Sequence, residues 1–264
     1  MSDSNCRLCG GARLRFLYQV NQCVLEKCPS CNFVQVSNLP DDDTISEIYS
    51  EEYFDHDKYA DDFSARKEQS FRQALVDDLP LREGGRILDA GCATGDFIGE
   101  LKGGFDMWGI DISPFAIDGA KLKFPEIKDR FSSAELNNYQ PKDKFDLVVL
   151  WDVIEHLKDP VSVVKDLYKH LQPGGYVIVS TPNIGALTAK IMKRRWAFMT
   201  PPEHLCFFDR KSLSYIFEEN GFSIVSWTTR GRWASLGFLI YKLKRVFPKM
   251  VPGFLVDLIK KSPL

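Results

Sequence analysis

One run of residues limits the fold of this chain more than any other. It extends from Arg86 to Gly95 and reads Arg-Ile-Leu-Asp-Ala-Gly-Cys-Ala-Thr-Gly. Its apolar half predicts a short buried strand, and its small residues predict a tight turn at the end of that strand. The segment 106–111 predicts a second strand, which ends in Asp111. A glycine turn lets a ligand approach bare backbone, and an acid at the neighbouring strand tip can accept hydrogen bonds from a ribose diol. Together the two segments predict a nucleoside-binding cleft.

The spacing of the glycines separates two classes of nucleoside cofactor. A dinucleotide turn has the pattern G-x-G-x-x-G and places a pyrophosphate on the next helix N-terminus. In this run Gly91 and Gly95 are separated by three residues, and Asp96 follows where the helix would begin. An acid there repels a pyrophosphate but suits an ammonium group, and Asp89 adds a second negative charge. The turn therefore favours S-adenosylmethionine, which carries a ribose, an ammonium and a sulfonium but no phosphate.

Five motifs in a fixed order resemble those of the class I S-adenosylmethionine-dependent methyltransferases. The first is the run at 88–95; the others are Gly-Ile-Asp-Ile-Ser at 109–113, Phe-Asp-Leu-Val-Val at 145–149, Asp-Val-Ile-Glu-His-Leu at 152–157 and Leu-Gln-Pro-Gly-Gly at 171–175. The resemblance implies an α/β fold: a Rossmann-like, mostly parallel sheet of the seven-stranded type with helices on both faces. It also implies that the cofactor is held at the strand tips by Asp89, Gly91, Cys92, Gly95, Asp111, Ile112, Ala134, Glu135, Trp151 and Asp152.

The apolar pattern of the central part of the chain alternates between strands and helices. Strands are predicted at 86–90, 106–111, 131–134, 145–151, 175–181 and 222–228, and helices at 95–102, 114–123, 160–171 and 211–219. Near-continuous apolar strands are typical of a parallel sheet that is covered on both faces. The last antiparallel strand of the family is less obvious and is expected within 233–241, unless a helix replaces it.

Four of the seven cysteines form two Cys-x-x-Cys pairs, Cys6 with Cys9 and Cys28 with Cys31. Two such turns can close a tetrahedron of thiolates around zinc, and the segments 13–20, 24–27 and 33–36 predict the strands between and after them. The N-terminal segment is therefore predicted to be a zinc ribbon. An all-cysteine site leaves no open position on the metal, so this zinc is expected to stabilise the fold.

Four segments are expected along the chain. They are the zinc ribbon at 1–38, a helical linker or lid at 39–83, the cofactor-binding core at 84–230 with an acceptor-side insertion at 182–209, and a basic amphipathic tail at 231–264. The combination of a ribbon and this core resembles the sugar methyltransferases. The C-methylating members carry a further C-terminal domain for which this chain is too short, so C-methylation is not expected.

Three residues are candidates for the chemistry of methyl transfer. A hydroxyl acceptor benefits from a general base, and a histidine near neutral pKa can take its proton. His204 lies in the acceptor-side insertion and is the first candidate, with Glu203 as its helper or rival. His156 is the third candidate. Each histidine could instead have a structural role, His204 by fixing its loop and His156 by ordering the turn after a strand.

Composition limits the partners of the chain. A net charge of −2 gives no basic excess of the kind that general nucleic-acid binding requires, so no nucleic acid is expected. The polar start and the lack of a run of about 18 apolar residues favour a cytoplasmic protein. The basic amphipathic tail is compatible with peripheral membrane contact, with packing on the core or with a dimer interface. The basic run at 190–196 predicts either a solvated helix face or a contact to the phosphate of a sugar acceptor.

These observations predict a methyltransferase that uses S-adenosylmethionine and a structural Zn²⁺ to act on a small-molecule acceptor. A sugar hydroxyl in glycan or secondary-metabolite biosynthesis is the first candidate for the acceptor, and a sugar that carries a phosphate group is one form that it can take. A phenolic hydroxyl of the quinone-biosynthesis type is the alternative. RNA modification and a non-catalytic, methyltransferase-like binding role are alternatives of another class.

Overall fold

The computed structural model describes residues 5–48 and 62–231, and the chain divides into two compact units. Residues 1–55 and 80–227 form the first unit, and residues 56–79 and 228–264 form the second. In the second unit, helix α3 (Asp62–Asp77) carries Glu68, which forms an ion pair with Arg230. The guanidinium of Arg230 also lies 3.7 Å from the ring centroid of Phe71. Part of the predicted lid (49–61) and nearly all of the predicted tail (232–264) lie outside the described residues.

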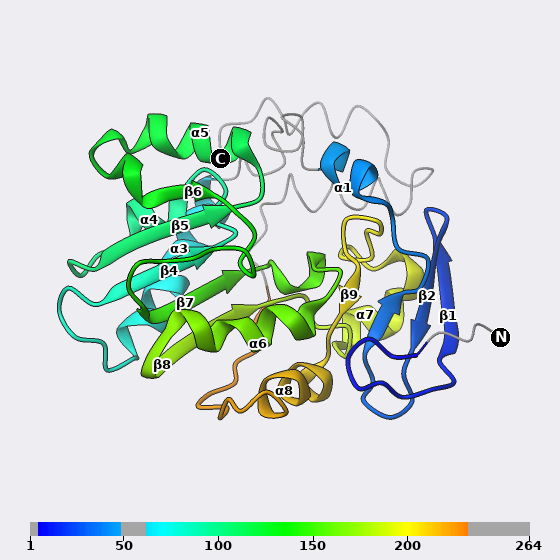
Figure 1. Cartoon of the computed structure of the whole chain (residues 1–264). Coiled ribbons are helices and arrows are strands. Elements are labelled where there is room, and N and C mark those ends of the chain that lie inside the picture. Colours follow the sequence, from blue (N-terminus) through cyan, green and yellow to red (C-terminus); the bar gives the residue numbers. More distant parts are fainter. Residues whose placement is uncertain (1–4, 49–61, 232–264) are drawn as a thin grey trace. The chain divides into compact units, whose positions relative to one another are not determined.

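The first unit contains a parallel sheet with the strand order β6-β5-β4-β7-β8. The bounds of these strands are β4 (Arg86–Ala90), β5 (Asp106–Asp111), β6 (Phe131–Ser133), β7 (Phe145–Trp151) and β8 (Leu171–Ser180). Helices α4 (Asp96–Glu100), α5 (Pro114–Lys123), α6 (Pro160–His170) and α8 (Arg210–Glu218) flank the sheet on both faces (Figure 1). Nearly every residue of β7 is buried, as expected for a strand that is covered on both sides. The predicted Rossmann-like α/β architecture is confirmed.

Local signals in the sequence start the three longest of these helices. Ser113 accepts a hydrogen bond from the backbone of Ala116 at the start of α5, and Asp159 does the same for Ser162 at the start of α6. A proline follows each of these two caps, at the position where a missing N–H does no harm. Asp209 and Ser212 form a reciprocal capping box at the start of α8. Helices α5, α6 and α8 begin within one residue of their predicted starts.

The strand predicted at 222–228 is wrong, because these residues form no strand. The backbone N–H of Phe222 donates to the carbonyl of Phe217 at 3.0 Å, which closes the end of α8. The Phe222 ring packs against Tyr168 with 4.5 Å between ring centroids. Ile224 and Val225 are exposed, so no neighbouring strand buries them. Within the described residues the parallel sheet therefore has five strands, and the alternative strand position at 233–241 lies outside them.

The N-terminal strands form a separate antiparallel sheet, as predicted. Strands β1 (Arg15–Val20), β2 (Cys23–Lys27) and β3 (Val34–Val36) pair in sequence order. The prediction lacked a fourth strand, β9 (Cys206–Phe207), which comes from the acceptor-side insertion. Strand β9 pairs with β3 through the partners Val34 with Phe207 and Gln35 with Cys206. The ribbon sheet is therefore completed by a segment from the far end of the core sequence.

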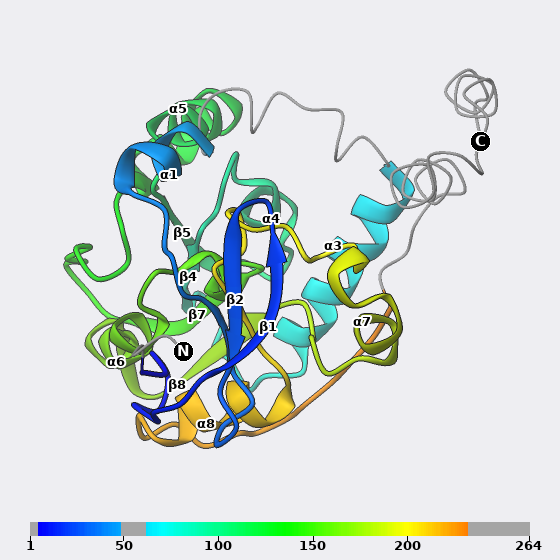
Figure 2. The same cartoon turned by 90° about the vertical axis from the view of Figure 1, so that its right-hand side faces the viewer.

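The ribbon sheet lies opposite the carboxyl ends of the parallel strands, as Figures 1 and 2 show from two directions. A single hydrophobic cluster includes Phe33 of the ribbon together with Leu150, at the end of β7, and Phe208. The side chain of Arg7 donates to the carbonyls of Leu205 at 3.0 Å and Lys158 at 2.5 Å. The ribbon and the parallel sheet consequently share one core within this unit.

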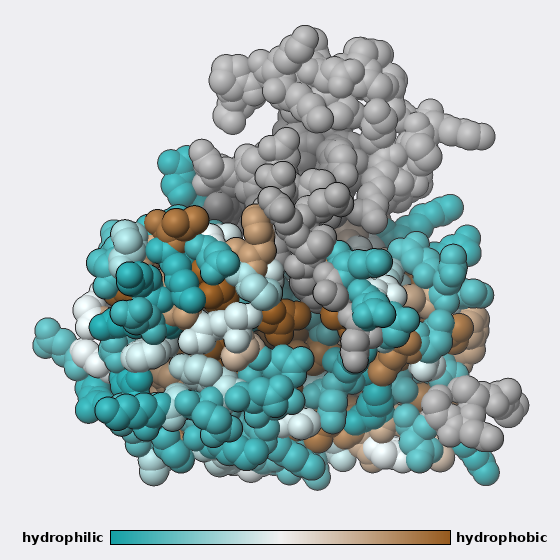
Figure 3. Space-filling view, turned by 45° about the horizontal axis from the view of Figure 1, so that its top comes forward, coloured by the Kyte–Doolittle hydropathy of each residue, from teal (hydrophilic) through white to brown (hydrophobic). Residues whose placement is uncertain are grey.

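The surface of the described residues is mainly hydrophilic on the face shown in Figure 3, with hydrophobic patches between the polar side chains. The exposed apolar residues include Ile112 and Phe115, which follow β5, and Leu122 on α5. None of the helices in the described part of the chain is long and apolar enough to cross a membrane.

Candidate active site and cysteine cluster

The turn after β4 is held close to the tip of β5 by backbone hydrogen bonds. The N–H groups of Gly91 and Cys92 both donate to the carbonyl of Ile110, at 2.8 and 3.0 Å. Gly91 adopts a φ of 89°, and a Cβ at this position would lie 2.4 Å from Cγ2 of Val153. A side chain at Gly91 would thus be strained in its backbone and would collide with the loop after β7. Gly95, at φ 78°, precedes α4 and ends the turn.

Asp111 at the tip of β5 connects the turn to the next helix. One carboxylate oxygen accepts a hydrogen bond from the N–H of Ala93 at 3.0 Å, and the other accepts from the N–H of Ser113 at 2.9 Å. Burial raises the pKa of the Asp111 carboxyl, while these backbone hydrogen bonds act in the opposite direction. Each carboxylate oxygen has two lone pairs, so the group can accept further hydrogen bonds from a diol.

Close packing beneath the turn explains the small residues at its base. The Cys92 side chain is buried, and its pKa is raised well above the ordinary value by burial and then by the charges of Asp89 and Asp111. A Cβ on Gly109 of β5 would lie 2.8 Å from the Cys92 sulfur. Cys92 is therefore a protonated packing residue that fits over a glycine, and the sequence-predicted residues Asp89, Cys92 and Asp111 lie together.

Three more of the predicted cofactor residues, Ile112, Ala134 and Glu135, follow the tips of β5 and β6. Ile112 follows β5 and is 47% exposed, which is unusual for an isoleucine and leaves its side chain available to a flat apolar ligand. The N–H of Ala134 donates to the carbonyl of Asp111 at 2.9 Å, so the residues after β6 lie beside the tip of β5. The Glu135 carboxylate accepts a hydrogen bond from Asn138 at 3.2 Å and is exposed.

The donor set of this turn fits S-adenosylmethionine better than a pyrophosphate. Asp89 and Asp111 provide negative charge at the strand ends, and Asp96 begins α4 where a phosphate would otherwise bind. Asp96 also forms an ion pair with Lys123. A ribose diol and an ammonium group are complementary to these carboxylates, whereas a phosphate is not.

The tip of β7 contributes Trp151 and Asp152. The Trp151 ring packs edge-on against Phe97 of α4 with 5.3 Å between centroids. Asp152 adopts a φ of 55°, which is uncommon for a residue other than glycine. Its N–H and one carboxylate oxygen both lie 3.0 Å from the hydroxyl of Ser180 at the end of β8. Ser180 thus fixes the orientation of Asp152, and the sequence-based prediction did not include it.

His156 and His204 lie together beyond the tip of β7. Their rings are edge-to-face with 4.8 Å between centroids. Nδ1 of His156 lies 2.9 Å from the carbonyl of Glu203, and Nδ1 of His204 lies 2.8 Å from the carbonyl of Phe198. A carbonyl only accepts, so we assign the proton to Nδ1 in each ring. Burial lowers the pKa of His156, although Glu203 acts in the opposite direction. The lowered pKa keeps this imidazole neutral near pH 7.

Glu155 joins the two histidines, and the sequence-based prediction did not include it either. One ligand atom of each of Glu155, His156 and His204 lies within 4.8 Å of the others, a set that could hold a divalent cation. The Glu155 side chain is 2% exposed, and its backbone carbonyl accepts from the N–H of Leu205 at 2.8 Å. Glu203, by contrast, forms its hydrogen bond to His156 through its backbone carbonyl. The signal for Glu155 was its place beside His156 at a strand tip.

The four cysteines of the two Cys-x-x-Cys pairs form one cluster, and each sulfur lies within 4.8 Å of the others. The sulfurs of Cys6 and Cys31 are 3.6 Å apart, as are those of Cys9 and Cys28. Zinc–sulfur bonds of about 2.3 Å place tetrahedral sulfurs roughly 3.8 Å apart, so the spacing fits zinc and is far too long for a disulfide. The close approach of Cys31 lowers the pKa of Cys6 to about 5.

The two cysteine turns have matching backbone geometry. The N–H of Gly10 donates to the carbonyl of Cys6 at 2.8 Å, and the N–H of Asn32 donates to the carbonyl of Cys28 at 3.0 Å. Both donors adopt a φ of 68°. Each pair therefore forms the same tight knuckle, and the predicted four-cysteine ribbon is confirmed as a cluster that could bind zinc.

The parallel sheet, the glycine turn after its first strand and the acid at the tip of its second define a class I S-adenosylmethionine-dependent methyltransferase. The comparison with known families agrees with this class. The chain belongs to a family described as "Methyltransferase domain", whose model matches residues 64–227.

Curated relatives are similar over less than half of this chain. A ubiquinone biosynthesis O-methyltransferase from Paracidovorax citrulli is 32% identical over 121 residues, which are 44% of this chain and 51% of that protein. A protein of the same name from Alkalilimnicola ehrlichii is 35% identical over 106 residues, which are 38% of this chain and 43% of that protein. The matches thus span about half the length of these relatives.

Among solved structures, the YcgJ protein from Bacillus subtilis has the same fold. It is 16% identical to this chain with a TM-score of 0.51, and the match covers 74% of this chain and 82% of that chain. Identity at this level shows the fold alone.

Proposed function

We propose that this chain transfers the methyl group of S-adenosylmethionine to a hydroxyl oxygen of a small molecule. The observation that carries the proposal is the pair of imidazoles beyond the tip of β7. His204 is 8% exposed and donates Nδ1–H to a backbone carbonyl, so its Nε2 is the basic nitrogen. An imidazole in this tautomer can take the proton of an acceptor hydroxyl as the new bond forms.

The residues of the chain would bind, orient and deprotonate. Asp111 would accept hydrogen bonds from the ribose hydroxyls of the cofactor, and Asp89 and Asp152 would lie near its positively charged end. His156 would position the His204 ring through their edge-to-face contact of 4.8 Å between centroids. The bound cofactor supplies the methyl group and the leaving group, so alignment of the acceptor is the main task of the protein. Zinc in the four-cysteine cluster would have a structural role.

A phenolic hydroxyl is the acceptor type that the relatives support, because those named above are ubiquinone biosynthesis O-methyltransferases. The chemistry of a single imidazole points the same way. A phenol has a pKa of about 10, roughly 3.5 units above that of histidine. An aliphatic hydroxyl resembles water, whose pKa is about 15.7, and is therefore much harder to deprotonate.

A sugar hydroxyl is the second candidate. The observation in its favour is a lysine-lined cavity between the ribbon sheet and the acceptor-side insertion, which suits an acceptor with a phosphate group. Both candidates require the same transfer to oxygen and differ in the remainder of the acceptor.

The proposal is tested by incubating the full chain with S-adenosylmethionine and a mixed panel of phenols and nucleotide sugars, with methylated products detected by mass spectrometry. A mass increase of one methyl group on an acceptor oxygen, lost in His204→Gln and in Asp111→Asn, is the expected result. Cofactor binding by calorimetry separates the two variants, because His204→Gln should still bind and Asp111→Asn should not. Methylation of an amine or a carbon in place of oxygen would overturn the proposal.

A further inference from the structure

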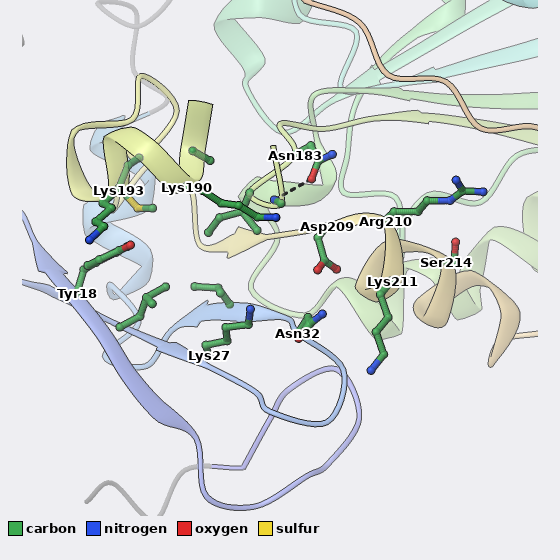
Figure 4. A pocket seen from close by; sticks show the side chains of 16 residues that line it. Tyr18, Lys27, Asn32, Asn183, Lys190, Lys193, Asp209, Arg210, Lys211 and Ser214 are labelled. Atoms are coloured by element: carbon green, nitrogen blue, oxygen red, sulfur yellow. Dashed lines mark hydrogen bonds between the residues drawn. The ribbon is translucent and has the colours of Figure 1, made fainter. Parts of the chain in front are cut away.

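A cavity of about 740 Å³ lies between the ribbon sheet and the acceptor-side insertion (Figure 4). One wall comes from β1 to β3 and includes Tyr18 and Lys27. The opposite wall comes from the loop after β8, helix α7 (Leu187–Met192) and the start of α8, and includes Lys190. We call this space the basic cavity. Its volume falls in the range of small-molecule sites, about 300–1,000 Å³.

Positive charge dominates the lining of the basic cavity. Five of its residues are cationic and one is acidic: Lys27, Lys190, Lys193, Arg210, Lys211 and Asp209. One carboxylate oxygen of Asp209 accepts hydrogen bonds from the backbone and hydroxyl of Ser212 at 2.9 Å each, and the five cations outnumber this one acid. Lining of this kind suits a ligand that carries more than one negative charge.

Two of the lysines converge from opposite walls. Figure 4 shows the ammonium groups of Lys27 and Lys190 directed toward the same space, with Arg210 extending away from it. Arg210 lies over the ring of Trp227, at 5.4 Å from the centroid, and Lys211 donates to the carbonyl of Ser30 at 2.6 Å. Within residues 5–48 and 62–231, Lys27 and Lys190 form no ion pair, so their charges are not balanced there. Such a pair is available to clamp phosphate oxygens.

The rest of the lining is suited to the base or sugar that a phosphate group would carry. Leu17, Val34 and Met199 provide apolar surface, and Asn183 contributes an amide whose oxygen accepts from the N–H of Gly185 at 2.8 Å. Lysines alone would suffice for a free phosphate, whereas a cavity of this volume with an apolar wall also accommodates a base or a sugar.

The basic cavity is connected to the proposed catalytic histidine through adjacent residues. Met199 lines the cavity, and the carbonyl of the preceding residue, Phe198, accepts the hydrogen bond from Nδ1 of His204 at 2.8 Å. Asn183 forms an isolated bridge with Phe208, next to the strand that joins the ribbon. A ligand in the cavity would therefore contact the same loop that fixes the base.

We propose that the basic cavity binds the diphosphate of a nucleoside diphosphate that is attached to the methyl acceptor. The inference rests on the proposed function, since it names the acceptor class for the same transfer to oxygen. Lys27 and Lys190 bind the phosphate oxygens from opposite sides, and the apolar wall contacts the nucleoside. The acceptor is then a nucleotide-linked sugar. Methylation of a neutral phenol by a chain that does not bind the diphosphate would contradict the inference.

The test is isothermal titration of the full chain with uridine diphosphate, inorganic pyrophosphate and inorganic phosphate. The variant is Lys27→Ala/Lys190→Ala. The matched control is Arg194→Ala/Arg195→Ala, which also removes two positive charges, from exposed residues that are near Lys190 in the sequence but outside the cavity lining. A charged hydrogen bond is worth about tenfold in affinity or more, so the double variant should weaken binding of uridine diphosphate about 100-fold. The control should stay within about twofold of the parent chain.

Three results would overturn the inference. They are the absence of uridine diphosphate binding to the folded chain, equal losses in the variant and the control, and equal affinity for pyrophosphate and uridine diphosphate. Binding of S-adenosylmethionine is measured on the same samples and should not change in either double variant. If the cofactor binds and a phenol is methylated while the diphosphate does not bind, the proposed function stands and this inference fails.

Discussion

The substitution Gly109→Ala, which adds one methyl group to β5 beneath the cofactor turn, should lower the free energy of unfolding. Gly109 lies in the middle of three parallel strands, and a Cβ at this position would meet side chains from three elements. The distances would be 2.7 Å to Cδ1 of Ile98, 2.8 Å to the sulfur of Cys92 and 2.9 Å to the ring of Phe131. All three are shorter than carbon contacts near 3.5 Å, so each neighbour would have to move.

The cost can be estimated from the packing. Ile98, Cys92 and Phe131 are all buried, and no neighbour of the new methyl group can move into open space. Overpacking of a well-packed core typically costs about 1–3 kcal/mol, and contacts on three sides place Gly109→Ala in the upper half of that range. With a urea dependence of roughly 1–3 kcal/mol per M, the unfolding midpoint should fall by about 1 M.

The matched control is Gly119→Ala on helix α5. A Cβ there would lie 3.6 Å from the Thr94 methyl group, which is an ordinary contact. Alanine also favours a helix over glycine by about 0.5–1 kcal/mol, so this variant should be as stable as the parent or more so. Urea unfolding followed by circular dichroism measures both. If Gly109→Ala unfolds at the same midpoint as the parent, the packing argument for the base of the turn is refuted.

Four further predictions concern the ribbon and the site. Arg7→Lys should lower the free energy of unfolding by about 2–3 kcal/mol, because one ammonium cannot reach both the Val36 and the Leu205 carbonyls that the guanidinium contacts. An unchanged midpoint in urea unfolding would contradict this. Elemental analysis should find one zinc per chain, and chelation or Cys28→Ser should lower the melting temperature; a metal-free chain of equal stability would refute a structural zinc. In calorimetry, binding of S-adenosylmethionine should tighten as pH rises through the raised pKa of Asp111, because the ionised carboxylate accepts the ribose hydrogen bonds; an affinity that does not change with pH would contradict this role. The pKa of His156 in the folded chain lies below the unfolded value of 6.5, so its contribution to stability is present above pH 6.5 and is lost as pH falls through the lowered pKa. Urea unfolding between pH 5 and 7.5 should therefore show an unfolding free energy that rises with pH, and His156→Gln should reduce that rise.

The cofactor turn could be predicted from the sequence because its determinants are local. The strand from Arg86, the positive-φ turn at Gly91 and the strand that ends in Asp111 each depend on residues within a few positions of one another. The same holds for the cysteine knuckles, in which each hydrogen bond spans four residues. Short-range hydrogen bonds and buried apolar runs leave a direct signal in the sequence.

The features that the sequence did not predict depend on distant contacts. Strand β9 is two residues long, which is too short to show the alternating hydrophobic pattern of a strand. It forms because it can pair with the edge of β3. The apolar residues from Phe222 onward resembled a strand, but aromatic packing on Tyr168 accounts for Phe222. Glu155 became a site candidate only when the fold brought His204 beside it. In each case the tertiary partner, and not the local pattern, decided the outcome.

The pairing of β3 with β9 also has a consequence for the order in which the protein is made. The two strands are separated by roughly 170 residues, so β3 leaves the ribosome long before its partner exists. At synthesis rates of about 5–20 residues per second, its edge is unpaired for roughly ten to thirty seconds. An unpaired strand edge is a template for association with other chains. A folded ribbon therefore remains an intermediate with an unpaired strand edge until nearly the whole core has emerged, and the nascent chain is most exposed to misassociation during that interval.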